Sequence, residues 1–136
     1  MIFLSSVSVY GEAGRNSPVS PNDRLSPSTE YGRSKVECEK QIINSGIKKY
    51  YILRLSPVFD ELHMDDVKKR VFLPIFKTIK ILIKPSPLHS LTNINTVLES
   101  VEKIIKLKKM NKINNVTDKQ LYSQKHISNW FQGSQL

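Results

Sequence analysis

Apolar and polar positions in the first sixty residues predict a strand, a loop, a helix and a second strand. Met1–Leu4 is a short apolar run that ends in two serines, as a buried strand entering a loop does. Residues 11–27 hold glycines and prolines among Ser, Asn and Asp, which is typical of a loop. Tyr50–Leu55 is rich in β-forming residues and is followed by Pro57, so it predicts another strand. This order is typical of a parallel α/β sheet.

The predicted helix lies between these two strands. Ser28 or Thr29 can cap its N-terminus, and Gly46 can end it. Spacings of four, three and four residues predict one buried helix face. Its members are Tyr31, Lys35, Cys38 and Ile42.

Past residue 60 the pattern is weaker but still predicts alternating elements. The expected elements are a helix from Asp66 to about Lys80 despite Pro74, a short strand at Ile81–Ile83, a helix capped by Asn95 or Thr96 that runs to about Lys109, a strand at Ile113–Val116, and helical turns over Ser123–Phe131.

Composition limits the class of protein. A chain of 136 residues suits one domain, and 39% hydrophobic with 24% charged residues is typical of soluble globular proteins. No apolar stretch approaches the roughly 20 residues of a membrane helix, and the start lacks the features of a secretory signal. The single cysteine excludes internal disulfides and a cysteine-based zinc site. We therefore expect a cytoplasmic protein with no membrane segment and no metal.

The net charge of +9 comes mainly from lysines in residues 61–112. Solvated helix faces, a site for phosphorylated ligands and a nucleic-acid surface are three explanations. Nucleic-acid binders usually gather basic residues on one face with aromatic residues between them. Here Lys103 and Lys106 follow apolar positions, as on the polar side of an amphipathic helix. Solvated faces are favoured, and we expect no nucleic-acid partner.

Two local patterns suggest chemistry. Tyr31 and Lys35 are four residues apart, so a helix places them on one face. A phenol with a pKa near ~10 is a poor base at neutral pH, but a nearby ammonium lowers that pKa and makes tyrosine a usable general acid and base. Ser5 and Ser6 end a predicted strand, where open α/β sheets bind ligands. Taken singly, a core tyrosine passed by a lysine and a strand-end turn explain both patterns.

Three linked segments together resemble a known family. Ser6–Gly11 reads Ser-Val-Ser-Val-Tyr-Gly, Tyr31–Lys35 reads Tyr-Gly-Arg-Ser-Lys and starts 25 residues after Ser6, and Leu53–Val58 reads Leu-Arg-Leu-Ser-Pro-Val. The combination resembles the extended short-chain dehydrogenase/reductases, and more closely the NAD-dependent epimerase/dehydratase family that acts on nucleotide sugars. The likeness is strong over residues 2–58 and continues more faintly to about Phe131.

The resemblance implies a catalytic set of Ser6, Tyr31 and Lys35. Tyr31 would exchange a proton with a sugar hydroxyl, while hydride passes between that carbon and a nicotinamide. Lys35 would bind the nicotinamide ribose and lower the pKa of Tyr31, and Ser6 would hydrogen-bond the reacting oxygen.

The resemblance also implies a cofactor, NAD or NADP, and a nucleotide-sugar substrate. The cofactor-binding candidates are Ser5, Tyr31, Lys35, Pro57 and Val58. The substrate-binding candidates are Ser6, Arg70 and His89. Either of the last two could face a diphosphate, although ordinary surface or helix-end positions are the preferred explanation for both.

Departures from the family pattern narrow the reaction. The 4,6-dehydratases carry an Asp-Glu pair directly after the catalytic Ser or Thr, where this chain has Val7 and Ser8, so epimerisation or simple oxidoreduction is preferred. His89 stands where the family often has Arg. An NAD(P)-dependent reductase of another hydroxyl or carbonyl substrate remains an alternative. So does a non-catalytic interaction module in which Tyr31 and Lys35 are relics.

The fold class expected from the resemblance is α/β: the second part of a Rossmann-like parallel sheet with part of a small substrate-binding region. Residues 1–60 would form the first part and residues 61–136 the remainder. None of the five glycines forms a Gly-x-Gly-x-x-Gly loop, on which cofactor binding in this fold depends. We therefore expect a fragment that binds NAD weakly or not at all and is inactive alone. A homodimer is among the expected states of a full-length form.

Overall fold

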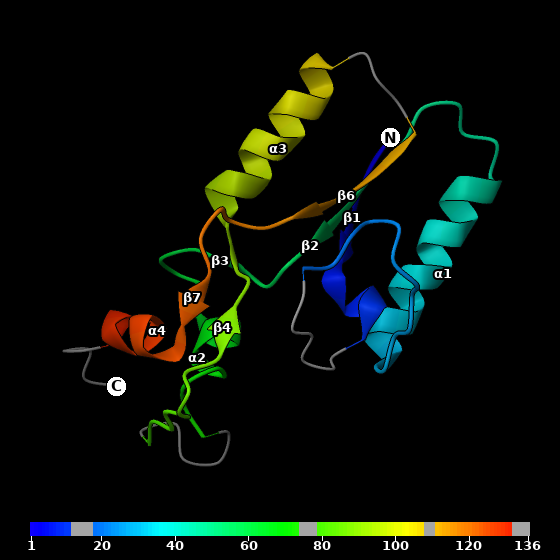
Figure 1. Cartoon of the computed structure of the whole chain (residues 1–136). Helices are drawn as coiled ribbons and strands as arrows, with labels where there is room; N and C mark the ends of the chain where they lie inside the picture. Colours follow the sequence, from blue (N-terminus) through cyan, green and yellow to red (C-terminus); the bar gives the residue numbers. More distant parts are fainter. Residues whose placement is uncertain (12–17, 74–78, 108–110, 132–136) are drawn as a thin grey trace. The chain divides into compact units, whose positions relative to one another are not determined.

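A parallel β-sheet organises the N-terminal part of the chain, as the pattern predicts. The computed structural model describes residues 1–11, 18–73, 79–107 and 111–131 (Figure 1). In the sheet, β1 (Ile2–Ser6) pairs in parallel with β2 (Tyr51–Leu55), and β2 pairs in parallel with β6 (Lys112–Val116). The carboxyl ends of the three strands therefore share one edge of the sheet.

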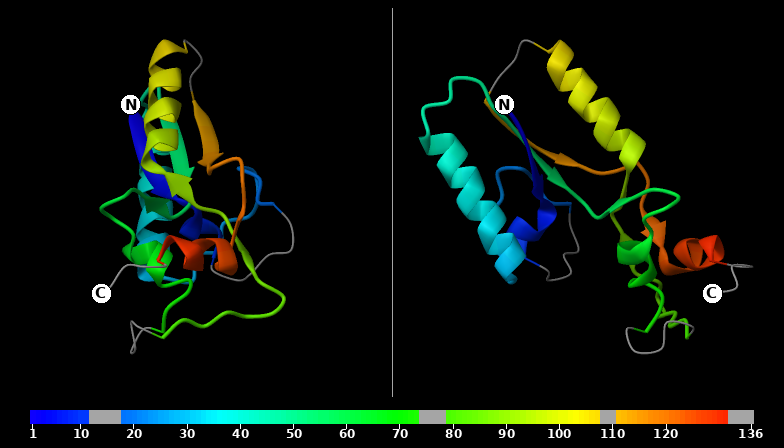
Figure 2. Two further views of the ribbon diagram at one scale, coloured as in Figure 1. Left: turned by 90° about the vertical axis from the view of Figure 1, so that its left-hand side faces the viewer. Right: turned by 180° about the vertical axis from the view of Figure 1, so that it is seen from behind.

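Helices cover both faces of this sheet, which explains why the central strand β2 is buried along its length. The helix α1 (Glu30–Asn44) lies on one face and α3 (Ile94–Lys106) on the other (Figure 2). Between α3 and the sheet, side chains of both pack into one apolar cluster. Its buried members are Tyr51, Leu53, Ile104 and Val116. A short 3₁₀ helix, η1 (Val7–Tyr10), follows β1 directly.

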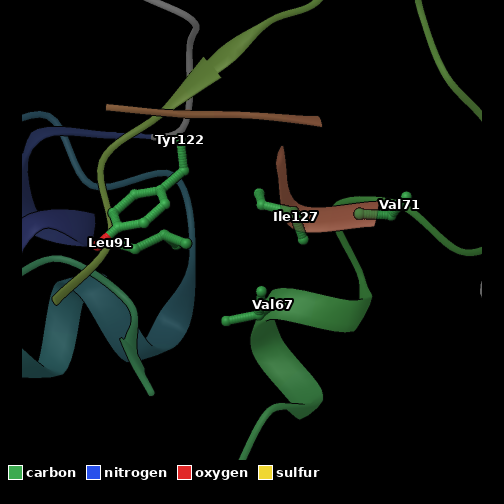
Figure 3. Packing of buried hydrophobic residues seen from close by; sticks show 5 residues of the cluster. All are labelled: Val67, Val71, Leu91, Tyr122 and Ile127. Carbon is green, nitrogen blue, oxygen red and sulfur yellow. The ribbon is translucent and has the colours of Figure 1, made fainter. Parts of the chain in front are cut away.

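The remaining elements build a second core from short pieces. These are β3 (Val58–Phe59) paired in parallel with β5 (Thr92–Asn93), β4 (Leu88–His89) paired antiparallel with β7 (Tyr122–Ser123), and the helices α2 (Asp65–Lys68) and α4 (Gln124–Trp130). The buried centre comes from both helices and from the strand region (Figure 3). Its members are Val67, Val71, Leu91, Tyr122 and Ile127.

The two cores belong to two compact units that alternate along the chain. The first comprises residues 1–56 and 95–116, and the second comprises residues 57–94 and the chain from 117 onward. A single boundary after residue 60 therefore does not separate these units, because α3 and β6 return to the first sheet. The pairing of β6 with β2 requires that return, since a parallel partner needs a crossover connection.

The helix α1 begins and ends as predicted, but its buried face differs from the prediction. Thr29 caps it by accepting a hydrogen bond from the Gly32 N–H at 3.0 Å, and Gly46 follows it with φ +73°. The buried members are Gly32 and Glu39, whereas Tyr31 and Cys38 are exposed. The prediction was wrong because the face toward the sheet carries a paired carboxylate in place of apolar side chains.

Two other predicted elements do not form. The helix expected from Asp66 to Lys80 ends at Lys68, and its positions 74–78 lie outside the described residues. The segments on either side bond to each other instead, since the Leu73 N–H donates to the Ile79 carbonyl and the Ile81 N–H to the Val71 carbonyl. Proline at 74 has no N–H for a helix, which favours this arrangement. Ile81–Ile83 is not a strand.

The predicted elements after residue 94 agree with the structure. The structure confirms the helix near Asn95, although α3 starts at Ile94 and is described to Lys106; positions 108 and 109 of the predicted helix lie outside the described residues. It also confirms β6 and the final helix. Ser123 caps α4 by accepting from the His126 N–H at 3.1 Å. Within the described ranges, no helix is long and apolar enough to cross a membrane.

Candidate active site

The two serines at the carboxyl end of β1 have different surroundings. Ser6 is half-buried and caps η1, where its Oγ accepts from the Ser8 N–H at 3.2 Å and lies 2.9 Å from the Ser8 Oγ. Ser5 is buried, and its Oγ donates to Glu39 Oε1 at 2.5 Å. The hydroxyl of Ser5 is therefore engaged inside the fold, so a cofactor contact by Ser5 would have to come from its main chain.

Tyr31 and Lys35 lie together on the first two turns of α1, as the four-residue spacing predicts. Tyr31 is 57% exposed, which leaves the phenol accessible. The Lys35 Nζ lies 5.5 Å from the centre of the Tyr31 ring and 5.0 Å from that of Phe3. It also donates to the Leu4 carbonyl at 3.1 Å. Lys35 thus connects the tyrosine to the strand that ends in Ser6.

Close backbone packing holds the start of α1 against η1. A Cβ atom at Gly32 would lie 2.7 Å from the Ser8 carbonyl oxygen, closer than real Cβ atoms approach. Gly11, at the end of η1, has φ +92°, and a Cβ there would lie 2.6 Å from the Ser26 carbonyl oxygen. Both glycines of the sequence motifs are therefore required by close contact. They bring the turn that carries Tyr31 next to the turn that follows Ser6.

Replacing Gly32 with Ala is expected to lower the free energy of unfolding by about 2 kcal/mol, because the added methyl group collides with a main-chain oxygen. Alanine has the better helix propensity by about 1 kcal/mol, so propensity would act in the opposite direction. Urea denaturation measures the change. Gly46→Ala is the control, since a Cβ added there would have no atom within 4 Å apart from those of its chain neighbours, and only the positive φ of Gly46 opposes the substitution. A stabilised Gly32→Ala variant would contradict the expected collision.

The sequence interpretation missed a buried polar network under α1. Arg54 on β2 forms an ion pair with Glu39 on α1, with Nη2 2.7 Å from Oε2 and Nε 3.0 Å from Oε1. The Arg54 Nη1 donates to the Tyr10 hydroxyl at 2.7 Å, and that hydroxyl donates to Asn115 Oδ1 at 2.7 Å. A lone arginine in the apolar run Tyr51–Leu55 was the available signal.

The network keeps Arg54 charged in its buried position. Burial alone would lower the pKa of Arg54, but hydrogen bonds from its guanidinium to Glu39 and Tyr10 outweigh burial, and the pKa is raised. The guanidinium also lies 5.0 Å from the centre of the Tyr10 ring. The tyrosine of the Ser-Val-Ser-Val-Tyr-Gly segment, Tyr10, therefore holds the buried Arg54 inside the first unit.

Pro57 and Val58, predicted beside the nicotinamide, begin the second unit. The Pro57 carbonyl accepts from the Thr92 N–H at 2.9 Å, and Val58 pairs with Thr92 where β3 meets β5. Both residues are half-buried. The structure thus places Ser6, Tyr31 and Lys35 in the first unit, with Tyr31 and Lys35 side by side, and places Pro57 and Val58 in the second.

Arg70 and His89, the two predicted diphosphate contacts, both lie in the second unit, where the charge of Arg70 acts on His89. Burial, and secondarily the charge of Arg70, lower the pKa of His89 from 6.5. The His89 Nε2 is buried and has no hydrogen-bond partner among the described residues, whereas the Arg70 side chain is exposed. The part of the chain that the structure describes holds no group of three or more His, Cys, Asp or Glu residues suited to a metal ion.

The pKa of His89 is expected to lie below 6.5, and Arg70→Gln should raise it part of the way back, since burial remains. NMR titration of the imidazole measures both values. The pKa of His89 is lower in the folded than in the unfolded chain. The contribution of neutral His89 to the free energy of unfolding is therefore fully present above about pH 6.5 and is lost as the pH falls. His89→Gln should remove this dependence. A His89 pKa at or above 6.5 in the wild type would contradict the assignment.

A scan against protein-family models decides the family. The model described as the RmlD substrate binding domain matches residues 1–82, more than half of the chain. The chain belongs to the RmlD substrate-binding domain family. The matched range includes the Ser6–Gly11 and Tyr31–Lys35 segments, on which the resemblance to extended short-chain dehydrogenase/reductases rests. That resemblance is confirmed.

Solved structures confirm the α/β, Rossmann-like fold of this RmlD-family chain. UDP-glucuronic acid 4-epimerase from Bacillus cereus, in complex with NAD, matches with a TM-score of 0.73 at 20% identity, over 98% of this chain and 47% of that one. RMD from Pseudomonas aeruginosa, complexed with NADPH, matches with a TM-score of 0.73 at 15% identity, over 96% and 50%. ADP-L-glycero-D-manno-heptose-6-epimerase from Helicobacter pylori matches with a TM-score of 0.70 at 24% identity, over 97% and 44%.

This RmlD-family chain spans about half the length of the solved proteins that it matches. Among the curated proteins, none matches its sequence.

Proposed function

We propose that this chain carries the serine, tyrosine and lysine of an NAD-dependent enzyme that epimerises a nucleotide sugar. One observation carries the proposal: the exposed Tyr31 has the Lys35 ammonium 5.5 Å from its ring centre, on a helix turn packed against the segment that follows Ser6. An accessible phenol beside an ammonium, close to the carboxyl end of a parallel strand, is suited to proton exchange with a bound hydroxyl.

Each residue has a role in the proposed site. In its phenolate form Tyr31 takes the proton from the substrate hydroxyl, and as the resulting phenol it returns that proton after the hydride is given back; the Lys35 ammonium stabilises the phenolate form. The Ser6 hydroxyl, half-buried at the end of β1, donates to the reacting oxygen. Nicotinamide, when bound, supplies the hydride acceptor and donor. Two similar structures are complexes with NAD and with NADPH, which supports the choice of cofactor class.

The residues present fit only one end of such a cofactor. Tyr31 and Lys35 form an accessible polar pair suited to the nicotinamide ribose. The pyrophosphate end needs a glycine-rich loop at a helix N-terminus, and the spacing of the five glycines in the sequence does not match the Gly-x-Gly-x-x-Gly motif. We propose that the 136-residue chain by itself binds the dinucleotide only weakly and does not turn over.

Arg70 and His89 are proposed contacts for the substrate diphosphate. The exposed guanidinium of Arg70 can bind phosphate oxygens, and the buried His89 Nε2 lacks a partner among the described residues. A neutral His89 can donate one hydrogen bond to a phosphate without carrying a charge of its own. Two of the similar structures are named for UDP- and ADP-linked sugars, which supports a nucleotide diphosphate as the common part of the substrate.

Epimerisation is preferred to dehydration because Val7 and Ser8 occupy the positions of the Asp-Glu pair of 4,6-dehydratases. Ser8 is moreover hydrogen-bonded to Ser6. A reductase of another hydroxyl or carbonyl substrate is the second candidate, and the NADPH complex of the Pseudomonas aeruginosa protein supports it. The two differ in cofactor balance, because epimerisation leaves the nicotinamide as it was and reduction consumes one NAD(P)H per product.

A chimera tests the proposal. This chain replaces the segment of the Bacillus cereus epimerase that superimposes on it, and UDP-, ADP-, GDP- and dTDP-linked sugars are offered with NAD or NADP. We expect an epimerised sugar with no net change in NADH absorbance, and micromolar NAD binding by the chimera but not by the 136-residue chain. Product formed with stoichiometric NAD(P)H consumption would favour the reductase. Micromolar NAD binding by the isolated chain would contradict the proposal that its residues fit only the nicotinamide end of the cofactor.

A further inference from the structure

One carboxylate inside the first unit gathers bonds from two strands. Glu39 on α1 accepts a hydrogen bond from the Ser5 hydroxyl on β1 at 2.5 Å, and it forms a bidentate ion pair with Arg54 on β2. The three side chains are each no more than 3% exposed. All three lie outside the proposed catalytic set, and their polar atoms face the interior.

Stability alone does not account for a buried ion pair of this kind. Removing two charges from water costs several kcal/mol per ion, and well-packed apolar residues of similar volume often stabilise a protein as well or better. What the ion pair adds is geometry. The planar guanidinium meets the carboxylate at 2.7 Å and 3.0 Å through two parallel N–H groups, so it sets the angle and the register between its two elements.

The elements joined in this way are those that carry the proposed catalytic residues. Glu39 is one helical turn beyond Lys35, and both lie toward β1. Ser5 directly precedes Ser6. Arg54 also donates to the Tyr10 hydroxyl at 2.7 Å, which holds η1, the turn that Ser6 caps. A rotation of α1 would break the Glu39 bonds and at the same time move Lys35 away from the Leu4 carbonyl.

We propose that Glu39, Arg54 and Ser5 are positioning residues, which set the rotation and register of α1 on β1 and β2 so that Tyr31 and Lys35 meet Ser6. This inference rests on the proposed function for its catalytic meaning. Its geometric content, the dependence of the Lys35 placement on Glu39 and Arg54, stands by itself and can be measured without turnover.

The test replaces the ion pair with apolar residues in the full chain, as Glu39→Leu/Arg54→Met. In the wild type, the Lys35 Nζ lies over the Phe3 and Tyr31 rings, so ring currents should shift its ε-methylene NMR signals upfield. We expect the double variant to melt at or above the wild-type temperature, yet to lose at least about half of that shift. The control Glu37→Leu, at an exposed position of the same helix, should keep it.

A folded double variant with an unchanged Lys35 shift would overturn the inference. Should the double variant not fold, Ser5→Ala decides, because it keeps the ion pair and removes only the bond from β1; a reduced Lys35 shift supports the inference and an unchanged one overturns it. In the active chimera, Glu39→Leu/Arg54→Met should lower kcat at least about tenfold and change KM less than about threefold. If the chimera that carries the wild-type ion pair is inactive, while the double variant of the 136-residue chain loses the Lys35 shift, the result counts against the proposed function only.

Discussion

Tyr31→Phe is expected to lower the turnover of the active chimera by about a thousandfold. The substitution removes only the hydroxyl, and proton transfer by a positioned side chain contributes about 10²- to 10⁴-fold to enzymatic rates. Tyr31 is 57% exposed, so the free energy of unfolding should change by less than about 0.5 kcal/mol. Initial rates at saturating substrate measure the first effect, and urea denaturation measures the second.

The matched control for this prediction is Tyr50→Phe. Tyr50 directly precedes β2, at the amino end of the strand and away from the edge where Ser6 lies. Its substitution should leave turnover within about twofold. Unchanged turnover in Tyr31→Phe would favour the alternative in which Tyr31 and Lys35 are relics in a non-catalytic interaction module.

Glu39→Gln is expected to lower the free energy of unfolding of the chain by about 3–5 kcal/mol, because it leaves the buried charge of Arg54 without its carboxylate. A loss of this size is a large part of the stability of a small domain. Urea denaturation followed by circular dichroism measures it, as a lower transition midpoint with an unchanged slope.

Glu37→Gln provides the comparison for Glu39→Gln. It makes the same chemical change two residues away on the exposed side of α1, and should cost less than about 0.5 kcal/mol. A loss below about 1 kcal/mol in Glu39→Gln would show that water reaches Arg54. The ion pair would then resemble the weak pairs found on protein surfaces.

Most elements of the first unit could be predicted from the sequence, because their signals are local. An apolar run before Ser5 and Ser6, a cap at Thr29 and a glycine at 46 each act on neighbours within a few residues. The prediction of a helix from Asp66 to Lys80 was wrong because the interactions that decide this segment are not local. Hydrogen bonds across the segment, from Leu73 to Ile79 and from Ile81 to Val71, compete with the helix.

The candidate site shows the same division. The spacing of Tyr31 and Lys35 predicts their proximity, since four residues are about one helical turn. It does not predict which helix face is buried. That face is chosen by Arg54, which lies 15 residues from Glu39 along the chain and meets it only when α1 packs on the sheet. A search for apolar positions therefore selected Tyr31 and Cys38, which are exposed.

By itself, the sequence determined the α/β class, the family and the pairing of a helical tyrosine with a lysine. These depend on motifs and on interactions between residues close in the chain. Only the tertiary structure decided the rotation of α1, the engagement of Ser5 with Glu39 and the return of α3 and β6 to the first sheet. The physical reason is that burial and the pairing of buried charges depend on contacts between segments distant in the sequence, and local propensity carries no information about such contacts.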